Sequence, residues 1–378
     1  MDAQATAGIP RAFESLPDPR RHNVRHKFLD IITIAFFAII SGCDDWCAVA
    51  AYGRSKFKWL AAFLDLPHGV PSHDTFGEVF SRLNPDAFEA CFRAWMQSMV
   101  ELSGGKLVAI DGKSIRRSFE HGWDKSGMAH IVSAFVQANR MVFAQEKTDG
   151  KGKELEAIEK LLRVLDLPGA VVTLDAIGCQ REIAASIIQA KADYVLQVKG
   201  NQSHLQQAIV TLIDDAMLDQ FQAMRSDHYQ QTDGDHGRVE TRTVHVTWNV
   251  ELLGEIVGKW PGLKSIAVID STRDVDGKIG QERHYYISSL DARRTARQFA
   301  GYIRGHWSVE NNLHWQLDVS FNEDQRRIRK GHGAENFSRL CRLALNLLKR
   351  ESSQKLGIAN KRRICGWDND YLLKVALS

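Results

Sequence analysis

The sequence predicts an α/β protein, with a mixed sheet flanked by helices, a β-rich insertion and an N-terminal helical domain. Three observations predict this class. Residues 1–103 show helical patterns without strands, short apolar runs alternate with amphipathic helices from Lys106 onward, and two segments within residues 201–290 have the alternation typical of strands. Strands that alternate with helices indicate a mixed sheet covered by helices.

The N-terminal region, residues 1–103, is predicted to be helical. Helices are expected from Phe28, over Trp46–Leu64, through Phe76–Leu83 and from Pro85. The stretch "LPHGVPSHDTF" separates the second and third helices with turn-forming residues. Short helices around such a turn fit a helix-turn-helix-like DNA reader, and they fit a plain helical cap equally well.

Residues 104–200 are predicted to form the first part of the core. The expected strands are "KLVAID", "AHIVSAFVQ", "RMVFAQEK", "GAVVTLDA" and "DYVLQVKG", and the expected helices are "KELEAIEKLLRVLDL" and "QREIAASIIQAKA". Unbroken apolar strands are typical of a sheet that is covered on both faces.

Residues 201–290 interrupt this alternation and residues 291–378 resume it. After a helix over Ser203–Met217, the segments "GRVETRTVHVTW" and "SIAVIDSTRDVDGKIGQERHYYISS" predict strands, the latter a hairpin that turns at Asp-Gly. The remainder is expected to contain the helix around Glu310, a basic stretch and a last long helix over Ala334–Arg350.

Composition places few limits on function. A net charge of +3 over 378 residues indicates no partner by itself. The most apolar stretch, from Ile31 to Cys43, has 13 residues, whereas a bilayer span needs about 20, and no secretory signal is recognised. The six cysteines are scattered without zinc-finger spacing. We therefore expect a cytoplasmic protein with reduced thiols and no membrane partner.

Three acidic residues occupy positions that suggest a shared site. Asp111 and Asp175 each end an apolar run, and a lone aspartate there often caps a helix or turns the chain. Glu310 shares a predicted helical face with Trp307, Leu313 and Leu317, where an unpaired charge is costly. Ligands of α/β sheets bind beyond the carboxyl ends of strands. If these strands are neighbours, the carboxylates meet there and require a divalent cation such as Mg²⁺ or Mn²⁺.

Basic segments beside two of these acids indicate a phosphate-containing substrate. Two metal ions held by carboxylates suit in-line phosphoryl transfer. The segments "GKSIRRS" and "DQRRIRKGH" lie close in sequence to Asp111 and Glu310, and "NKRRICGW" follows near the C-terminus. Any one basic run is often only a solvated surface, but basic runs beside acids favour a nucleic acid backbone.

Several segments together resemble the DDE transposases of bacterial insertion sequences, in the branch that includes the H-repeat-associated proteins. They are "AIDGKSIRRS", "VVTLDAIGCQ", "YVLQVKGNQ", "DHGRVETR" and "HWSVENNLHWQLDVSFNED", and the resemblance spans nearly the whole chain. It implies an RNase H-like fold with acids on the first strand, the fourth strand and a late helix. Asp111, Asp175 and Glu310 match these positions and would be the catalytic and metal-binding residues.

The resemblance also implies an activity and partners. The family cuts DNA strands at the terminal inverted repeats of its element, with metal ions, and joins the freed 3′-OH to target DNA. The implied partners are double-stranded DNA, as element ends and target, and a second copy of the chain when two ends are paired. Two alternatives remain: a non-catalytic DNA-binding relic or regulator, and another two-metal nuclease.

The chain departs from related cut-and-paste enzymes around Glu310. Those enzymes carry Arg four residues before the last acid and Lys seven residues after it, and here His306 and Leu317 occupy these places. Tyr302 and Arg304 lie nearby but outside that spacing, so the auxiliary roles are not transferred. The choice between a hairpin and a linear DNA intermediate stays open.

Other residues have both a functional and a structural interpretation. His314 either contacts phosphate or packs and bonds to backbone, Glu323 and Asp324 either add an acid near the metals or cap a helix, and Trp307 and Trp315 are expected in the core. The candidate DNA-binding residues are Lys113, Arg116, Arg117, Lys199, Asn201, Arg238, Arg304, His306, His314, Arg326, Arg327, Arg329 and Lys330.

Overall fold

The computed structural model describes residues 12–21, 24–99, 106–119, 128–148, 152–235 and 238–377. The chain divides into two compact units. The first unit comprises Met1–Glu101, Gly112–Lys153 and Glu310–Ser378, and the second comprises Leu102–Asp111 and Glu154–Val309. The chain passes from one unit to the other within strand β1 (Leu107–Ser114) and at the end of helix α11 (Ala296–Val309).

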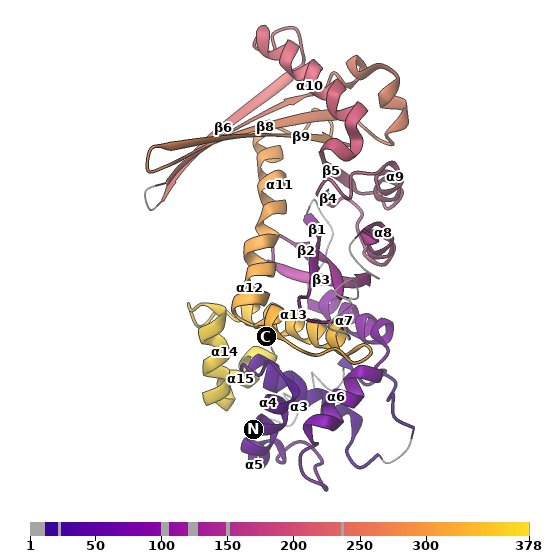
Figure 1. Cartoon of the computed structure of the whole chain (residues 1–378), viewed down its shortest axis with the longest axis vertical. Helices are drawn as coiled ribbons and strands as arrows, with labels where there is room; N and C mark the ends of the chain where they lie inside the picture. The colour runs from indigo at the N-terminus through magenta and orange to yellow at the C-terminus, as the bar shows by residue number, and fades with distance from the viewer. Residues whose placement is uncertain are drawn as a thin grey trace. The chain divides into compact units, whose positions relative to one another are not determined.

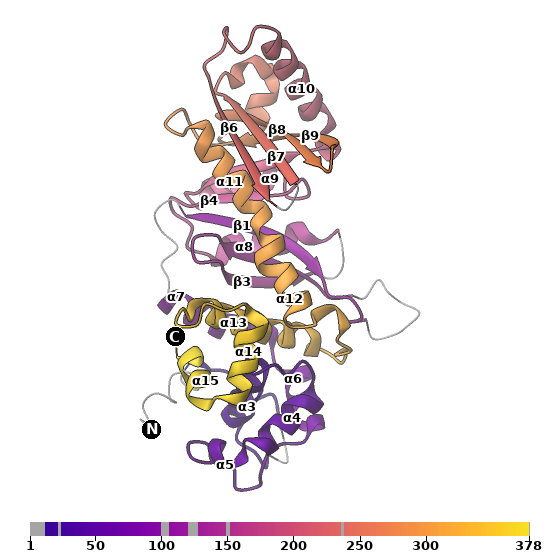
Figure 2. The same cartoon turned by 90° about the vertical axis from the view of Figure 1, so that its left-hand side faces the viewer.

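The first unit is built around one long helix, α13. Its elements are α3 (Phe28–Ile40), α4 (Trp46–Ser55), α5 (Phe57–Leu60), α6 (His73–Arg82), α7 (Pro85–Met99), β2 (His130–Val136), β3 (Met141–Thr148), η4 (Glu310–His314), α12 (Trp315–Val319), η5 (Glu323–Gln325), α13 (Gly333–Arg350), α14 (Ile358–Trp367) and α15 (Asn369–Ala376). Helix α13 contacts α3, α6, α7, α14, α15 and β3 (Figures 1 and 2). Elements from both ends of the sequence therefore share one core.

The apolar segment that begins at Phe28 forms α3, and all its residues except Leu29 are buried. Its contacts with α13 and α14 make α3 part of the core of the first unit. The predicted domain boundary at residues 103/104 lies outside the described residues, and the other predicted boundaries stay predictions. The compact units divide the chain differently because C-terminal helices pack against N-terminal ones.

The second unit contains most of the sheet. Its further elements are α8 (Glu154–Val164), β4 (Val171–Leu174), α9 (Arg181–Gln189), β5 (Asp193–Val198), η2 (Gly200–Gln202), α10 (Ser203–Leu218), β6 (Ser226–Asp235), β7 (Arg238–Thr247), η3 (Val250–Lys259), β8 (Ser265–Val275) and β9 (Lys278–Ser288). Strands β1, β4 and β5 are parallel, and β9, β8, β7 and β6 continue antiparallel from β5. Helix α11 packs on β4, β6 and β7, and α8 and α9 lie on the opposite side of β4 and β5 (Figure 1).

The strand order over the whole sheet is β3-β2-β1-β4-β5-β9-β8-β7-β6. The predicted class, a mixed sheet flanked by helices with a β-rich insertion, is confirmed. The hairpin turn at Asp276 and Gly277 is also confirmed: both residues have positive φ angles, 51° and 79°, as the favoured two-residue hairpin turn requires. In the described part of the chain, no helix has the length and apolar character that a bilayer crossing needs.

Three features of the elements differ from the prediction or were not part of it. Strand β6 was not predicted, because its sequence "SDHYQQTDGD" is polar; it is an edge strand that pairs only with β7 and needs no apolar face. The predicted last long helix over Ala334–Arg350 is α13, and two shorter helices without predicted bounds, α14 and α15, follow it. Strand β1 continues three residues beyond Asp111, to Ser114, rather than ending at that aspartate.

The basic stretch near the C-terminus is part of the protein core. Lys361 and Arg362 are buried in α14. The Lys361 ammonium donates to the carbonyl oxygen of Leu348 at 3.0 Å, and the Arg362 guanidinium donates to that of Ile39 at 2.8 Å. The expectation that this stretch contacts a polyanion is therefore wrong for these two residues, because their donors are used inside the first unit.

Buried ion pairs connect α7 to α13. The Arg339 guanidinium donates to Glu89 at 2.6 Å and to Glu335 at 3.2 Å, and all three side chains are buried. The other Glu89 oxygen accepts from the backbone N–H of Gln145 in β3 at 3.0 Å. One arginine thus links two helices and a strand of the first unit.

Replacing Arg339 with Met should strongly destabilise the first unit. The variant leaves Glu89 and Glu335 buried without their counter-ion, which costs about 3–5 kcal/mol in comparable cases. Urea unfolding followed by tryptophan fluorescence measures the loss. Arg163→Met is the matched control, because Arg163 is exposed and its pair with Glu159 lies along one helix, a kind of pair worth at most about 0.5 kcal/mol. Equal unfolding midpoints for the two variants would contradict this assignment.

Candidate active site

Asp111 and Asp175 are neighbours because their strands pair. β1 and β4 are parallel, with Ile110 opposite Leu174. Asp111 and Asp175 are the next residues in the two segments, so they lie side by side. Burial raises the pKa of the Asp175 carboxyl, and the negative charge of Asp111 raises it further. The second unit therefore holds two carboxylates that repel each other at one sheet edge, an arrangement that a cation would relieve.

The loop after Asp175 is held by several hydrogen bonds. One Asp175 oxygen accepts from the backbone N–H groups of Ile177 at 3.0 Å and Gly178 at 3.4 Å. The Asn201 amide donates to the carbonyl oxygen of Ala176 at 2.6 Å, and the Gln202 amide donates to that of Cys179 at 3.0 Å. Asp175 thus turns the chain, as a lone aspartate would, and its side chain is oriented by that turn.

Glu310 does not lie on a buried helical stripe, so that expectation is wrong. Its side chain is 68% exposed, and Trp307 is 51% exposed, whereas Leu313 and Leu317 are buried. The reason is that Glu310–His314, η4, is a π-helix. A π-turn holds one more residue than an α-turn, so residues before and after it do not share one 3.6-residue face. Trp315, also expected in the core, is likewise 51% exposed.

The π-helix places His314 beside Glu310. His314 is buried, and its Nδ1 lies 3.1 Å from a carboxylate oxygen of Glu310. This hydrogen bond lowers the pKa of the Glu310 carboxyl. Sequence reasoning considered His314 as a phosphate contact or a packed residue and missed its carboxylate partner, although a spacing of four residues on a helix was available as the signal.

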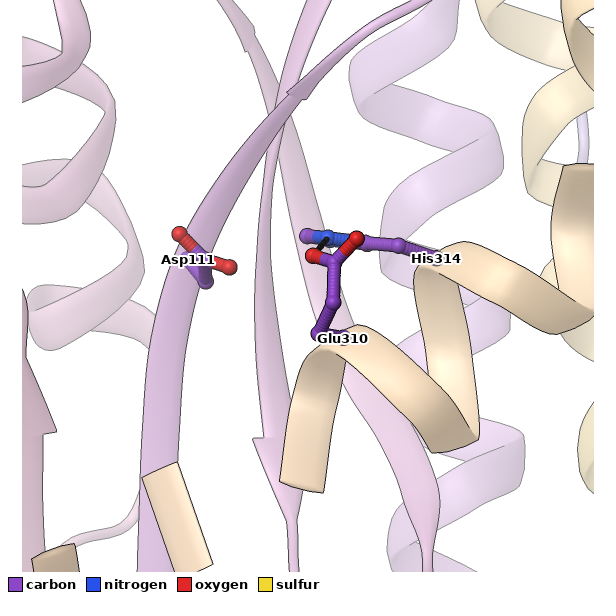
Figure 3. A group of neighbouring side chains, drawn as sticks. All are labelled: Asp111, Glu310 and His314. Carbon is purple, nitrogen blue, oxygen red and sulfur yellow. Dashed lines mark hydrogen bonds and ion pairs between the residues drawn. The ribbon is translucent and has the colours of Figure 1, made fainter. Parts of the chain in front are cut away.

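Asp111, Glu310 and His314 form a group that could hold a metal ion. One ligand atom from each residue lies within 4.8 Å of the other two. Figure 3 shows the Asp111 carboxylate on its strand facing the adjoining side chains of Glu310 and His314. Two carboxylates and an imidazole form a mixed oxygen–nitrogen donor set, which suits Mg²⁺ or Mn²⁺ through the oxygens and also softer divalent ions through the nitrogen.

A buried charge network lies two residues beyond Asp111. The Lys113 ammonium is 2.7 Å from Asp318, 3.4 Å from Asp324 and 3.7 Å from Glu323. Glu323 is fully buried and also accepts from Arg342 at 3.1 Å and from the Ser338 hydroxyl at 2.8 Å. Of the two interpretations of Glu323, a further acid near the metals stays a prediction, and its contacts are with buried cations and a hydroxyl rather than with helix N–H groups. Glu323 joins β1, η5 and α13.

The network keeps Glu323 ionised. Burial opposes the charged form, but Arg342 first and then Lys113 outweigh it and lower the pKa of Glu323 to about 2. The charges of Glu323 and its acidic neighbours raise the pKa of Lys113 despite burial. These groups balance each other's charges in the interior.

Many of the candidate DNA-binding cations contact other protein groups. Arg326 is buried and stacks on Phe337. The other contacts are Arg116 with Asp324, Arg329 with the carbonyl oxygen of Arg117 and with Phe119, Lys330 with Glu78, Arg238 with Glu240, and Arg304 with Asp233. Arg327 and Lys199 are exposed. His236 and Gly237, which precede Arg238, lie outside the described residues.

His306, at the place of the family's arginine, contacts the second unit's sheet. Its Nδ1 lies 3.1 Å from the Thr173 hydroxyl on β4, and a positive charge on His306 would favour ionised Asp175. The structure thus places a titratable nitrogen base near Asp175 from α11, where related enzymes carry a permanent cation.

Comparisons with known proteins define the class of the chain. Residues 102–347 match the family described as "Transposase DDE domain", and residues 11–96 match the family described as "DDE_Tnp_1-associated". The chain therefore belongs to the DDE transposase family.

Its relatives place it within that family. It is similar to "Putative transposase YncI" of Escherichia coli O157:H7, with 39% identity over 96% of this chain and 93% of the relative. It is also similar to "H repeat-associated putative transposase YhhI" of Escherichia coli K12, with 37% identity over 95% of each chain. A solved piggyBac transposase synaptic complex with hairpin DNA aligns with 11% identity and a TM-score of 0.38, covering 98% of this chain and 77% of that one. The resemblance to H-repeat-associated proteins is confirmed.

Replacing Glu323 with Gln should destabilise the protein at neutral pH and reduce its sensitivity to acid. A carboxyl pKa lowered from 4.5 to about 2 contributes on the order of 3 kcal/mol above the unfolded pKa. That contribution is lost as the pH falls from about 4.5 toward 2, and the variant lacks it throughout. Unfolding free energies at pH 7 and pH 3.5 test this, with exposed Glu255→Gln as the control. The same pH dependence in wild type and E323Q would refute the network.

Proposed function

We propose that the protein is an active DDE transposase that cuts DNA at terminal inverted repeats and transfers the freed strand to target DNA, using divalent metal ions. The observation that carries this proposal is the group formed by Asp111, Glu310 and His314, with Asp175 beside Asp111, in a chain of this family. The catalytic residues would be Asp111, Asp175 and Glu310.

The proposed cofactor is a pair of Mg²⁺ ions, or Mn²⁺ in their place. Asp111 would serve both ions, because it lies in the group with Glu310 and also next to Asp175. Bound ions of this kind polarise the phosphate, activate the attacking oxygen and stabilise the leaving oxygen. The donor set supports this, since the two aspartates repel each other and the Glu310 carboxyl is held ionised.

The protein's own groups would orient these ligands. The turn that follows Asp175 fixes the direction of its carboxylate. His314 holds Glu310 through a hydrogen bond. The Lys113 network anchors the end of β1 to α12 and to the segment that follows it. Preorganised ligands of this kind reduce the reorganisation needed during the reaction.

The proposed partners are double-stranded DNA, as element ends and target, and a second copy of the chain when two ends are paired. Among the candidate cations, Arg116, Arg327 and Lys199 are exposed and best placed for backbone contacts. The proposed location is the bacterial cytoplasm, in association with the nucleoid. The proposed domain organisation keeps a helical region at residues 1–103 for DNA recognition.

Asp111→Asn and Glu310→Gln should each abolish cleavage, because each removes a ligand charge while keeping side-chain volume. The substrate is a labelled duplex that contains the inverted repeats bordering the gene, and nicking is followed on a denaturing gel with Mg²⁺ and with EDTA. We expect a loss of at least 100-fold for both variants, and the same loss for wild type in EDTA. Asp276→Asn in the exposed hairpin turn is the matched control.

Each result points to a definite function. Normal nicking by Asp111→Asn or Glu310→Gln would contradict the proposed site. Specific binding of the repeats by wild type without Mg²⁺-dependent nicking would instead identify a DNA-binding relic. Equal nicking of duplexes with and without the repeats would identify a different two-metal nuclease.

A further inference from the structure

A basic cavity lies next to the loop that follows Asp175, within the second unit. It has a volume of about 490 Å³ and is formed by the starts of α9 and α10 and by the end of η3. Its basic lining residues are Arg181, His204 and Lys259. None of the three was among the residues suggested by the sequence, because they lie far apart in it and in no basic run.

The charges around this cavity are unbalanced. No carboxylate is among its described lining residues, although Glu182 and Glu255 lie close in sequence. Several other arginines of the same unit are held by carboxylates: Arg163 by Glu159, Arg242 by Asp233 and Glu240, and Arg283 by Asp214 and Asp270. Arg181 and Lys259 are exposed and form no ion pair among the residues that the structure describes. A cavity that gathers unbalanced cations fits an anionic ligand.

The backbone adds to this preference. Helices α9 and α10 begin after Gln180 and Gln202, and neither of these side chains caps its helix. The first N–H groups of each helix and its positive dipole end therefore add to the charge of the side chains. This contribution supports the cation cluster and the cavity, which carry the assignment.

The cavity is joined to the candidate active site through two side chains. Asn201 and Gln202 line it and also donate to the carbonyl oxygens of Ala176 and Cys179, in the loop after Asp175. β4 and β5 are parallel, so Asp175 and the start of η2 follow the carboxyl ends of neighbouring strands. Ligands of α/β sheets bind at such edges.

The geometry points to a binding site for the phosphodiester backbone of DNA, with Arg181 and Lys259 as the principal cations and His204 beside them. This assignment rests on the proposed function, because that function makes DNA the anion delivered to this edge. The cavity would hold the strand on the Asp175 side of the site. Its contacts are with phosphates and carry no base preference.

The test measures how DNA affinity depends on salt. Fluorescence anisotropy is recorded with full-length Arg181→Ala/Lys259→Ala and with wild type, on labelled duplexes that contain the inverted repeats or a scrambled sequence. Each lost phosphate contact lowers the slope of log K against log salt by about 0.9. We expect the double variant to lose about two units of slope and the same factor of affinity on both duplexes. Arg163→Ala should behave as wild type.

Charge-conserving variants separate this role from a structural one. Arg181→Lys/Lys259→Arg should restore the slope, because the charges remain. An unchanged slope for the double alanine variant, or a loss confined to the repeat duplex, would overturn the phosphate site. Failure of the proposed function gives a different result: wild type then binds DNA but does not nick it. If wild type nicks DNA and the double alanine variant keeps the wild-type salt slope, only the phosphate site in the cavity is refuted.

Discussion

Repulsion between carboxylates is the constraint on which the candidate site depends. Parallel pairing of β1 with β4 sets Asp111 and Asp175 side by side, and the pKa of Asp175 rises because it is buried near another negative charge. The π-helix adds a further carboxylate and an imidazole to this group. An edge that concentrates negative charge in this way favours the binding of a cation or the protonation of one carboxyl.

The interior of the first unit contains buried charged groups beside its apolar core. Helix α13 buries Arg339 and Arg342 against Glu89, Glu335 and Glu323, and α14 buries Lys361 and Arg362 against main-chain carbonyl groups. The contacts of Arg339 with Glu89 and of Arg362 with Ile39 join elements that are distant in sequence, whereas the pair of Arg339 with Glu335 lies within α13. Buried ion pairs are sensitive to geometry, since removing one partner costs several kcal/mol. They favour one arrangement of β1, η5 and α13 over alternatives that would leave a charge unpaired.

Sequence reasoning succeeded where a single element determines its own pattern. The apolar runs that end before Asp111 and Asp175, the Asp276-Gly277 turn and the alternation in β7 depend on local chemistry, and the structure contains each of them. The sequence did not predict features that depend on a contact with a residue or strand elsewhere in the chain. The basic run around Arg362 has the sequence of an exposed segment. The structure shows instead that the Arg362 guanidinium donates to the carbonyl oxygen of Ile39, which lies far away in the sequence. The polar segment β6 forms a strand because its backbone pairs with the neighbouring strand β7.

The candidate site divides in the same way. Asp111 and Asp175 lie side by side because the two apolar runs form neighbouring parallel strands, although β1 continues past Asp111. Glu310 was placed on the wrong face, because periodicity assumes 3.6 residues per turn and the chain departs from it at that residue. The hydrogen bond of His314 with Glu310 and the grouping of Arg181 with Lys259 are visible only in the folded chain.

The π-helix at Glu310–His314 makes the number of residues in this turn important for the candidate site. Adjacent residues of an α-helix are separated by about 100° around its axis. Removing one residue from this segment would return the backbone to regular α geometry, because the turn would no longer hold its extra residue. The position of Glu310 relative to His314 and Leu317 would then change, so the length of this turn matters as much as its sequence.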